Sequence, residues 1–197
     1  GSSASANRVM HTITKWIEHK LGLKVNATKT HICRPSKLKY LGFGFYKSSQ
    51  TKQWTARPHE SSVEKFQRKL KSLCKRSWSI SLTDRIAMLN SVIRGWINYF
   101  SIGAMKSRIE KIDEHLRTML RKVIWKQWKT PQKRAWGLRK LGIDKDLAKL
   151  TSYCGNRYEW VVRKTCVARA ISKEILTRRG LVSCLDYYTI RHSLKTN

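Results

Sequence analysis

The side chains best suited to a chemical role in this sequence are lysines and arginines that recur along residues 106–140. This stretch holds twelve Lys or Arg against three acids, a local charge of +9. Cations at such density can neutralise neighbouring phosphates of a nucleic acid and release their condensed counterions. The expected chemistry is therefore binding of a polyanion. The candidate nucleic-acid-binding residues in this stretch are Lys106, Arg117, Arg121, Lys122, Lys126, Lys129, Lys133, Arg134, Arg139 and Lys140.

A second candidate face lies in residues 82–103, where small polar groups flank a cation at helical spacing. Ser91, Arg94, Asn98 and Ser101 form this face, which suits phosphate or ribose; an ordinary solvated surface is the alternative. An apolar stripe for a core follows another face of the same helix, at Ile86, Leu89, Ile93, Ile97 and Phe100. Ser81 with Asp84 predicts the start of this helix, and Gly103 predicts its end.

Side chains that serve in metal binding or covalent catalysis are dispersed. The aspartates Asp84, Asp113, Asp144, Asp146 and Asp186 are isolated, and the six histidines do not cluster. The five cysteines include no C-x-x-C pair, so neither a zinc site nor a disulfide framework is indicated. We expect reduced, mostly buried thiols and no cofactor for this stretch of protein.

The charge of the whole chain supports a nucleic-acid partner. Lys and Arg outnumber Asp and Glu by 42 to 12, which gives a formal charge of +30. A membrane surface is the competing polyanion, but no apolar run approaches the roughly 18 residues that a spanning helix needs. No signal peptide opens the sequence. A cytoplasmic protein without a membrane partner is expected.

The fold predicted from the sequence is mostly α-helical, with a small α+β segment at the N-terminus. The first five residues look like the remnant of an expression tag or an engineered joint. Residues 6–59 contain an amphipathic helix (6–21), strand-like alternation (23–33) and a β-hairpin (38–46 with 53–56). Gly42 and Gly44 within the hairpin indicate a bulge or the close approach of another backbone. Pro58 ends this segment.

Residues 60–194 form the second predicted domain and contain helices only. A helix after Ser61 or Ser62 would bury Val63, Phe66, Leu70 and Leu73. Beyond the helix of residues 82–103, further helices are expected at 109–128, 131–141, 144–151, 161–178 and 185–191.

Three blocks of this sequence resemble one protein family. LGLKVNATKT and LKYLGFGFY, within residues 21–46, resemble the end of the palm domain of reverse transcriptases encoded by group II introns. RGWINYFSIG, WKQWKTPQKR and LRKLGI resemble the thumb or maturase region, domain X, of the same proteins. Because no nuclease-like module rich in His and Asn follows, the bacterial class without an endonuclease domain is the closer match. The resemblance implies the end of a palm, with a helix and a β-hairpin, followed by a helical-bundle thumb.

The resemblance also implies roles for single residues. Lys29 matches a lysine near the phosphates of the incoming nucleotide, an auxiliary catalytic role in the full protein; an ordinary surface lysine is the alternative. The primer grip would consist of Leu41, Gly42, Phe43, Gly44 and Phe45, although the two phenylalanines also suit a core. Arg94, Asn98 and the cations of residues 106–140 would face intron RNA or the template-primer duplex. Most of the eight tryptophans suit a core, but Trp125, Trp128 and Trp136 lie among cations in the sequence, so we expect these three to be exposed for stacking.

The function implied is intron RNA splicing, template-primer binding and RNA-directed DNA synthesis in retrohoming by the full protein. Such polymerases hold two metal ions, with Mg²⁺ expected in the full protein, on carboxylates that include an adjacent Asp pair. This sequence has no such pair, so we predict that it is inactive alone. The alternative is a stand-alone helical module that binds RNA or DNA. The sequence leaves the oligomeric state open.

Overall fold

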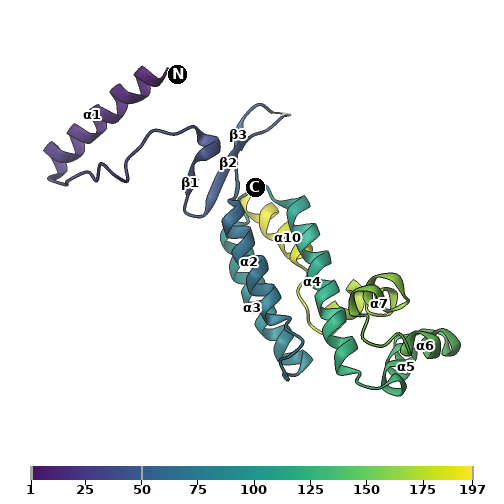
Figure 1. The fold of residues 1–197 in the computed structure, drawn as a ribbon. Coiled ribbons are helices and arrows are strands. Elements are labelled where there is room, and N and C mark those ends of the chain that lie inside the picture. Colours follow the sequence, from purple (N-terminus) through teal and green to yellow (C-terminus); the bar gives the residue numbers. More distant parts are fainter. Residues whose placement is uncertain (1, 50, 197) are drawn as a thin grey trace.

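The fold is a helical bundle with a small antiparallel sheet at the N-terminal end, as the sequence predicts. The computed structural model describes residues 2–49 and 51–196. Figure 1 shows the order along the chain: a first helix, the sheet, and then the bundle, with the C-terminal helix returning toward the sheet.

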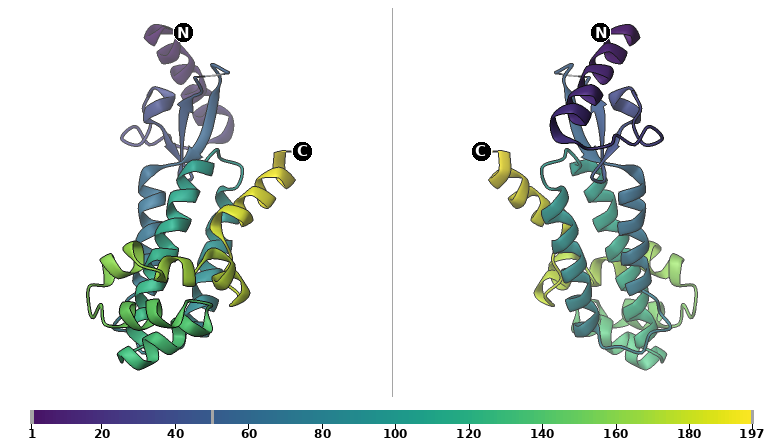
Figure 2. Two further views of the ribbon diagram at one scale, coloured as in Figure 1. Left: turned by 90° about the vertical axis from the view of Figure 1, so that its right-hand side faces the viewer. Right: turned by 90° about the vertical axis from the view of Figure 1, so that its left-hand side faces the viewer.

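Helix α1 (Ser3–Leu21) lies apart from the bundle in all three ribbon views (Figures 1 and 2). It begins three residues before the predicted start, because the Ser2 side chain accepts a hydrogen bond from the Ser5 N–H at 3.2 Å and caps the helix there. Its end at Gly22 agrees with the prediction, since this glycine has φ +63°. None of its residues is buried within the described structure.

The strand predicted over residues 23–33 is wrong. Asn26 instead forms a turn, in which its side-chain oxygen accepts hydrogen bonds from the backbone N–H groups of Thr28 and Lys29 at 3.0 and 3.1 Å. Such local bonds compete with strand pairing, which alternation in the sequence does not reveal. A short 3₁₀ helix, η1 (Pro35–Lys37), then leads into the sheet.

The sheet consists of β1 (Lys39–Tyr40), β2 (Phe43–Lys47) and β3 (Trp54–Pro58), paired antiparallel in that order. Strands β2 and β3 form the predicted hairpin. Strand β1 is an addition: Leu41 and Gly42 have φ +47° and +79° and make a two-residue turn, so LKYLGFGFY folds back on itself. A Cβ at Gly42 would lie 3.1 Å from atoms of Ser62 and Phe100, so side chains approach this glycine closely, and not the other backbone that was predicted.

The bundle core is built from α2 (Glu60–Leu73), α3 (Leu82–Phe100), α4 (Lys106–Gln127) and α10 (Cys184–Thr196). The predicted apolar stripes of α2 and α3 are buried, and the rings of Phe66 and Trp96 stack between them with centroids 4.4 Å apart. His59, rather than Ser61 or Ser62, caps α2 through its imidazole. The helices lie side by side in Figure 2.

Of the two predicted ends of α3, the start is confirmed and the end is wrong. Ser81 caps the start as expected, accepting from the Asp84 N–H at 3.0 Å. Gly103 is not the C-cap: Ser101 holds that position, and Gly103 has no positive φ. The glycine instead lies against β3, where a Cβ would meet the Arg57 Cα at 3.3 Å. A tertiary contact, invisible in the sequence, explains this glycine.

Five shorter helices cover the far end of the bundle. They are α5 (Pro131–Lys140), α6 (Lys145–Ser152), α7 (Tyr158–Lys164), α8 (Val167–Ala170) and α9 (Lys173–Arg178). The single helix predicted over residues 161–178 is wrong. Thr165 and Ser172 interrupt it, and each accepts a backbone hydrogen bond at the start of the next helix.

Two buried charges connect elements within the bundle. The guanidinium of Arg85 donates to the carbonyl oxygens of Leu73 and Trp78, which joins α3 to the end of α2 and the following loop. Asp113 on α4 accepts from the backbone N–H of Cys184 at 2.8 Å and pairs with Arg117 at 2.5 Å. Asp113 therefore fixes the start of α10 on α4.

Candidate nucleic-acid interface

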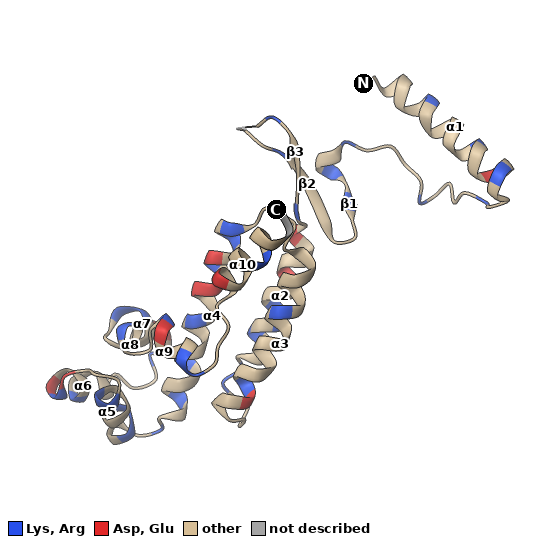
Figure 3. Cartoon of the chain, turned by 180° about the vertical axis from the view of Figure 1, so that it is seen from behind, with Lys and Arg blue, Asp and Glu red and all other residues tan. Residues whose placement is uncertain are grey.

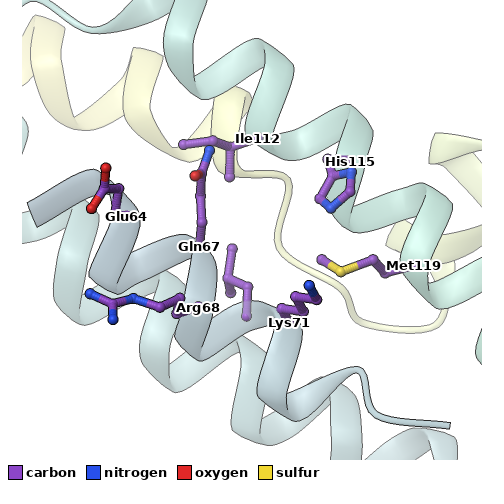
Figure 4. Close-up of a pocket in the computed structure, with 8 residues that line it drawn as sticks. Glu64, Gln67, Arg68, Lys71, Ile112, His115 and Met119 are labelled. Carbon is purple, nitrogen blue, oxygen red and sulfur yellow. The ribbon is translucent and has the colours of Figure 1, made fainter. Parts of the chain in front are cut away.

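A groove between α2 and α4 is lined mainly by cations and suits a polyanion. Its upper part is a hollow of about 540 Å³. Figure 4 shows side chains of α2 facing those of α4 across this hollow. Its lining consists of Glu64, Gln67, Arg68, Leu70 and Lys71 from α2 and Ile112, His115 and Met119 from α4.

The groove continues toward the C-terminal ends of both helices. A second hollow of about 530 Å³ shares Lys71 and Met119 with the first, so the two are contiguous. It is lined in addition by Cys74, Lys75, Arg76, Ser77, Lys122, Lys126 and Tyr158. We call the combined depression the α2–α4 groove.

Positive charge dominates this groove. Among its described lining residues, six are cations and one, Glu64, is a carboxylate. The cations are Arg68, Lys71, Lys75, Arg76, Lys122 and Lys126. Desolvation, followed by the charges of Lys122 and Arg163, lowers the pKa of His115, so this imidazole is neutral at neutral pH. The groove presents a positive field around an uncharged ring.

Helix α7 closes the lower end of the groove. The Arg76 guanidinium lies 4.1 Å above the centre of the Tyr158 ring. Glu159 pairs with Lys122 and accepts from the Arg163 Nε at 2.6 Å. The hydrogen bond from Lys122, above all, lowers the pKa of Glu159, so this carboxylate is charged at neutral pH. One acidic side chain thus neutralises part of the cationic rim.

The cations predicted on α4 occupy two flanks of the helix rather than one stripe. At about 100° per residue, Lys122 and Lys126 face the α2–α4 groove, whereas Lys106, Arg117 and Arg121 lie on another side. Arg121 is half-buried and its Nε donates to the Ile171 carbonyl at 2.9 Å. Arg117 is engaged by Asp113. Arg121 therefore connects α4 to the end of α8, Arg117 is paired within α4, and Lys106 is exposed.

Helix α5 and the turn before it carry a second group of cations (Figure 3). Lys129, Lys133, Arg139 and Lys140 are exposed, and Lys140 lies 4.9 Å from the centre of the Trp136 ring. Trp136 is 63% exposed, as predicted. This end of the molecule therefore combines cations with an exposed aromatic surface.

Other residues predicted on this surface are buried. Arg134 is only 6% exposed, because its Nε donates to the Trp128 carbonyl at 3.0 Å and its guanidinium lies over Trp125. Trp125 is fully buried and donates to the Gly155 carbonyl, so its predicted exposure is wrong. Trp128 is half-buried and packs on the core.

The predicted polar face of α3 is largely covered by α10. Asn98 accepts a hydrogen bond from the Tyr187 hydroxyl at 2.9 Å, and the Ser101 carbonyl lies 2.6 Å from the His192 Nδ1. Ser101 is buried. Arg94 remains exposed, with its guanidinium 5.9 Å from the centre of the Tyr187 ring. Arg94 and Ser91 therefore stay exposed, whereas Asn98 and Ser101 contact α10.

The predicted primer-grip residues of the β1–β2 turn contact α3. The ring of Phe43 packs on Tyr99 and Phe100 with centroid distances of 5.8 and 4.9 Å. The Tyr99 hydroxyl donates to the Leu41 carbonyl at 2.9 Å. Gly44 is buried and Phe45 half-buried. Lys29 is exposed. It belongs to the segment between α1 and η1, which lies away from the bundle in Figure 1.

Sequence reasoning missed the α2 side of the groove. Its site residues are Arg68, Lys71, Lys75 and Arg76, with His115 on α4. The density of cations opposite the apolar stripe of α2 is a signal for them. Which flank of α4 they face depends on packing, which sequence periodicity does not specify.

No three His, Cys, Asp or Glu side chains in residues 2–49 and 51–196 gather in a way that could hold a metal ion. Within the same residues, no helix is long and apolar enough to cross a bilayer.

The fold and the groove define a helical module suited to a polyanionic partner. Residues 63–142 match the model of a protein family, the group II intron maturase-specific domain. This segment spans nearly all of α2, all of α3 to α5, and both walls of the upper groove. The match supports a group II intron maturase with a role in intron splicing. No curated protein matches the chain.

Proposed function

We propose that this protein binds group II intron RNA through the α2–α4 groove and the exposed cations of α5, and thereby assists splicing. The observation that carries the proposal is the position of the groove: its six cations all lie in the segment that matches the maturase-specific domain. Phosphate contacts from such cations position RNA without reading its sequence.

The experiment is a measurement of RNA affinity against salt concentration. Lys71, Lys75 and Lys126 line the groove and are exposed, so their triple change to Gln removes three charges with little effect on folding. Each lost phosphate contact lowers the slope of log affinity against log salt by about 0.7 to 0.9. We expect weaker binding and a slope smaller by about two units.

A matched triple change tests whether position matters. Lys15, Lys24 and Lys47 are exposed and belong to α1, the following segment and β2, outside the groove. Their change to Gln removes the same charge and should leave affinity and slope nearly unchanged. Equal losses from both triples would show that binding senses only the overall charge, and the groove would have to be abandoned as the site.

We extend the proposal to the full reverse transcriptase and maturase that the sequence resembles, in its bacterial, cytoplasmic form. Residues 6–59 would be the end of the palm, with Lys29 near the nucleotide phosphates and residues 41–45 as primer grip. Mg²⁺ on carboxylates outside this sequence would support RNA-directed DNA synthesis and retrohoming. The exposed apolar residues Val9, Ile13 and Trp16 of α1 support the proposal, because a palm would cover them.

Polymerisation by the full protein tests this extension. Because the role proposed for Lys29 is chemical, Lys29→Ala should slow nucleotide incorporation while template-primer affinity stays nearly normal. Equal losses in binding and rate would reduce Lys29 to a phosphate contact. The chain of 197 residues should itself incorporate no nucleotide with Mg²⁺, since it lacks an adjacent Asp pair.

A further inference from the structure

We infer that the α2–α4 groove takes an unpaired strand of RNA, with its bases on the apolar floor and its phosphates at the cationic rims. This inference rests on the proposed RNA-binding function and adds the form of RNA that the groove selects. Its basis is the combination of floor, rims and two rings in one depression.

The floor is apolar and narrow. It is formed by Leu70 of α2 with Ile112 and Met119 of α4, all of which belong to the packed core. Helices in such contact have axes about 8–10 Å apart, so the hollow between them is far narrower than a nucleic-acid duplex. A paired helix would rest on the rims, whereas unpaired bases can lie on the floor.

The His115 ring and the Arg76 guanidinium over Tyr158 provide stacking surfaces along the groove. His115 lies in its upper part, and it is uncharged at neutral pH because desolvation and neighbouring cations lower its pKa. Tyr158 lies at the lower end beneath the Arg76 guanidinium. Unpaired bases of RNA stack on aromatic rings and on arginine planes, which paired bases inside an A-form helix cannot do.

The charge of the groove would also suit an acidic peptide. RNA is favoured by two features: the stacking surfaces at His115 and Arg76, and the family match, which includes both walls of the upper groove. A peptide rich in glutamate can pair its carboxylates with the cations at the rims, but it has no flat ring that could stack inside the groove. An acidic peptide is therefore the competing occupant that the experiment must include.

The experiment compares three probes by fluorescence anisotropy at one salt concentration: a 12-nucleotide unstructured RNA, a blunt 12-base-pair RNA duplex, and a 12-residue polyglutamate peptide. The protein variants are His115→Ala in the groove and His11→Ala on α1 as a matched control, both at exposed positions. Stacking on one side chain is worth about 1–3 kcal/mol, so we expect His115→Ala to weaken the unstructured RNA about fivefold or more. The duplex should weaken less than twofold, and His11→Ala should change neither.

Photo-crosslinking gives a second measurement that does not depend on a variant. An unstructured RNA carrying 4-thiouridine should crosslink to peptides from residues 64–76 and 112–126 of the unaltered chain. Crosslinks confined to other peptides would overturn the inference, as would a peptide bound as tightly as RNA and equally sensitive to His115→Ala.

The outcomes separate this inference from the proposed function. If unstructured and duplex RNA bind equally and His115→Ala affects neither, while the Lys71, Lys75 and Lys126 triple weakens both, the groove binds RNA without selecting unpaired strands. That result overturns the inference and leaves the proposed function standing. Absence of binding to either RNA by the unaltered protein would overturn both.

Discussion

Glu159 of α7 forms an ion pair with Lys122 of α4 at the rim of the α2–α4 groove. The same carboxylate accepts from the Arg163 Nε at 2.6 Å, so one acid engages two cations. A carboxylate held by a lysine and an arginine occupies the position that an RNA phosphate would take between them. Glu159 therefore competes with RNA phosphates for the side chains of Lys122 and Arg163.

The first prediction is that Glu159→Gln strengthens RNA binding. The change frees Lys122 and Arg163 for phosphate contacts, so affinity should rise about two- to fivefold at low salt and the salt slope should steepen. Stability should change little, because ion pairs at exposed sites contribute about 0–1 kcal/mol. Glu110→Gln, on another side of α4 and also exposed, is the control and should have a smaller effect. Weaker binding by the Glu159 variant would show that the pair organises the site instead of blocking it.

The second prediction concerns Arg85, which is 0% exposed. Arg85→Met removes the donor to the carbonyl oxygens of Leu73 and Trp78 and leaves them without their partner. Each such loss costs about 1–3 kcal/mol, so the free energy of unfolding should fall by about 2–4 kcal/mol in denaturant titration. Arg85→Lys keeps the charge but cannot reach both oxygens in the same geometry. Its free energy of unfolding should therefore lie between those of the unaltered protein and the Met variant. A loss below about 1 kcal/mol for the Met variant would mean that water replaces the guanidinium.

The third prediction is a pattern of thiol reactivity. Burial raises the pKa of Cys74 to about 12, despite the opposing charge of Arg85, and burial also raises the pKa of Cys184. Because the thiolate is the reactive form, iodoacetamide at pH 8 should label Cys33, Cys154 and Cys166 and spare these two, as read by peptide mass spectrometry. Early labelling of Cys74 would contradict the packing at the end of α2.

The same pKa gives the sign of a pH effect on stability. Above about pH 9 the Cys74 thiol ionises in the unfolded chain but stays protonated in the folded one, so the unfolded state binds fewer protons. The free energy of unfolding should then decrease as pH rises from about 9 toward 12. Cys74→Ala removes this contribution, and urea titrations of both proteins at pH 8 and pH 10 measure the difference.

Much of the bundle was predictable because its helices are amphipathic on their own. The stripes of α2 and α3 and the Ser81 cap are local patterns, and the structure places them as predicted. The errors have two causes. A tertiary contact makes Gly103 face β3 instead of ending α3, and local side-chain hydrogen bonds at Thr165 and Ser172 break a stretch that is apolar enough for one helix.

The candidate site was predictable in composition but not in shape. The density of cations over residues 106–140 predicts a basic region, but it does not distinguish an exposed cation such as Lys126 from a buried one such as Arg134. The structure exposes Lys126 in the groove and buries Arg134 beside Trp125. A guanidinium can serve as an internal hydrogen-bond donor, and only the packing of α5 on α4 reveals which arginines do so.

The fourth prediction uses Gly137 to separate the placement of α5 from its charge. A Cβ at this buried position would lie 2.7 Å from ring atoms of Trp128, so Gly137→Ala forces the helix and the indole apart. Overpacking of this kind costs about 1–3 kcal/mol, which thermal denaturation can measure. The exposed cations and Trp136 of α5 would shift together, so RNA affinity should fall although no charge is lost. The slope of log affinity against log salt should also decrease.

Gly95→Ala is the matched control, because Gly95 is exposed within α3 and has no atom within 4 Å of the added Cβ. An alanine inside a helix should stabilise the protein by about 0.5–1 kcal/mol and leave RNA binding unchanged. If Gly137→Ala is destabilised but binds RNA normally, α5 takes no part in the interface, and binding belongs to the α2–α4 groove alone.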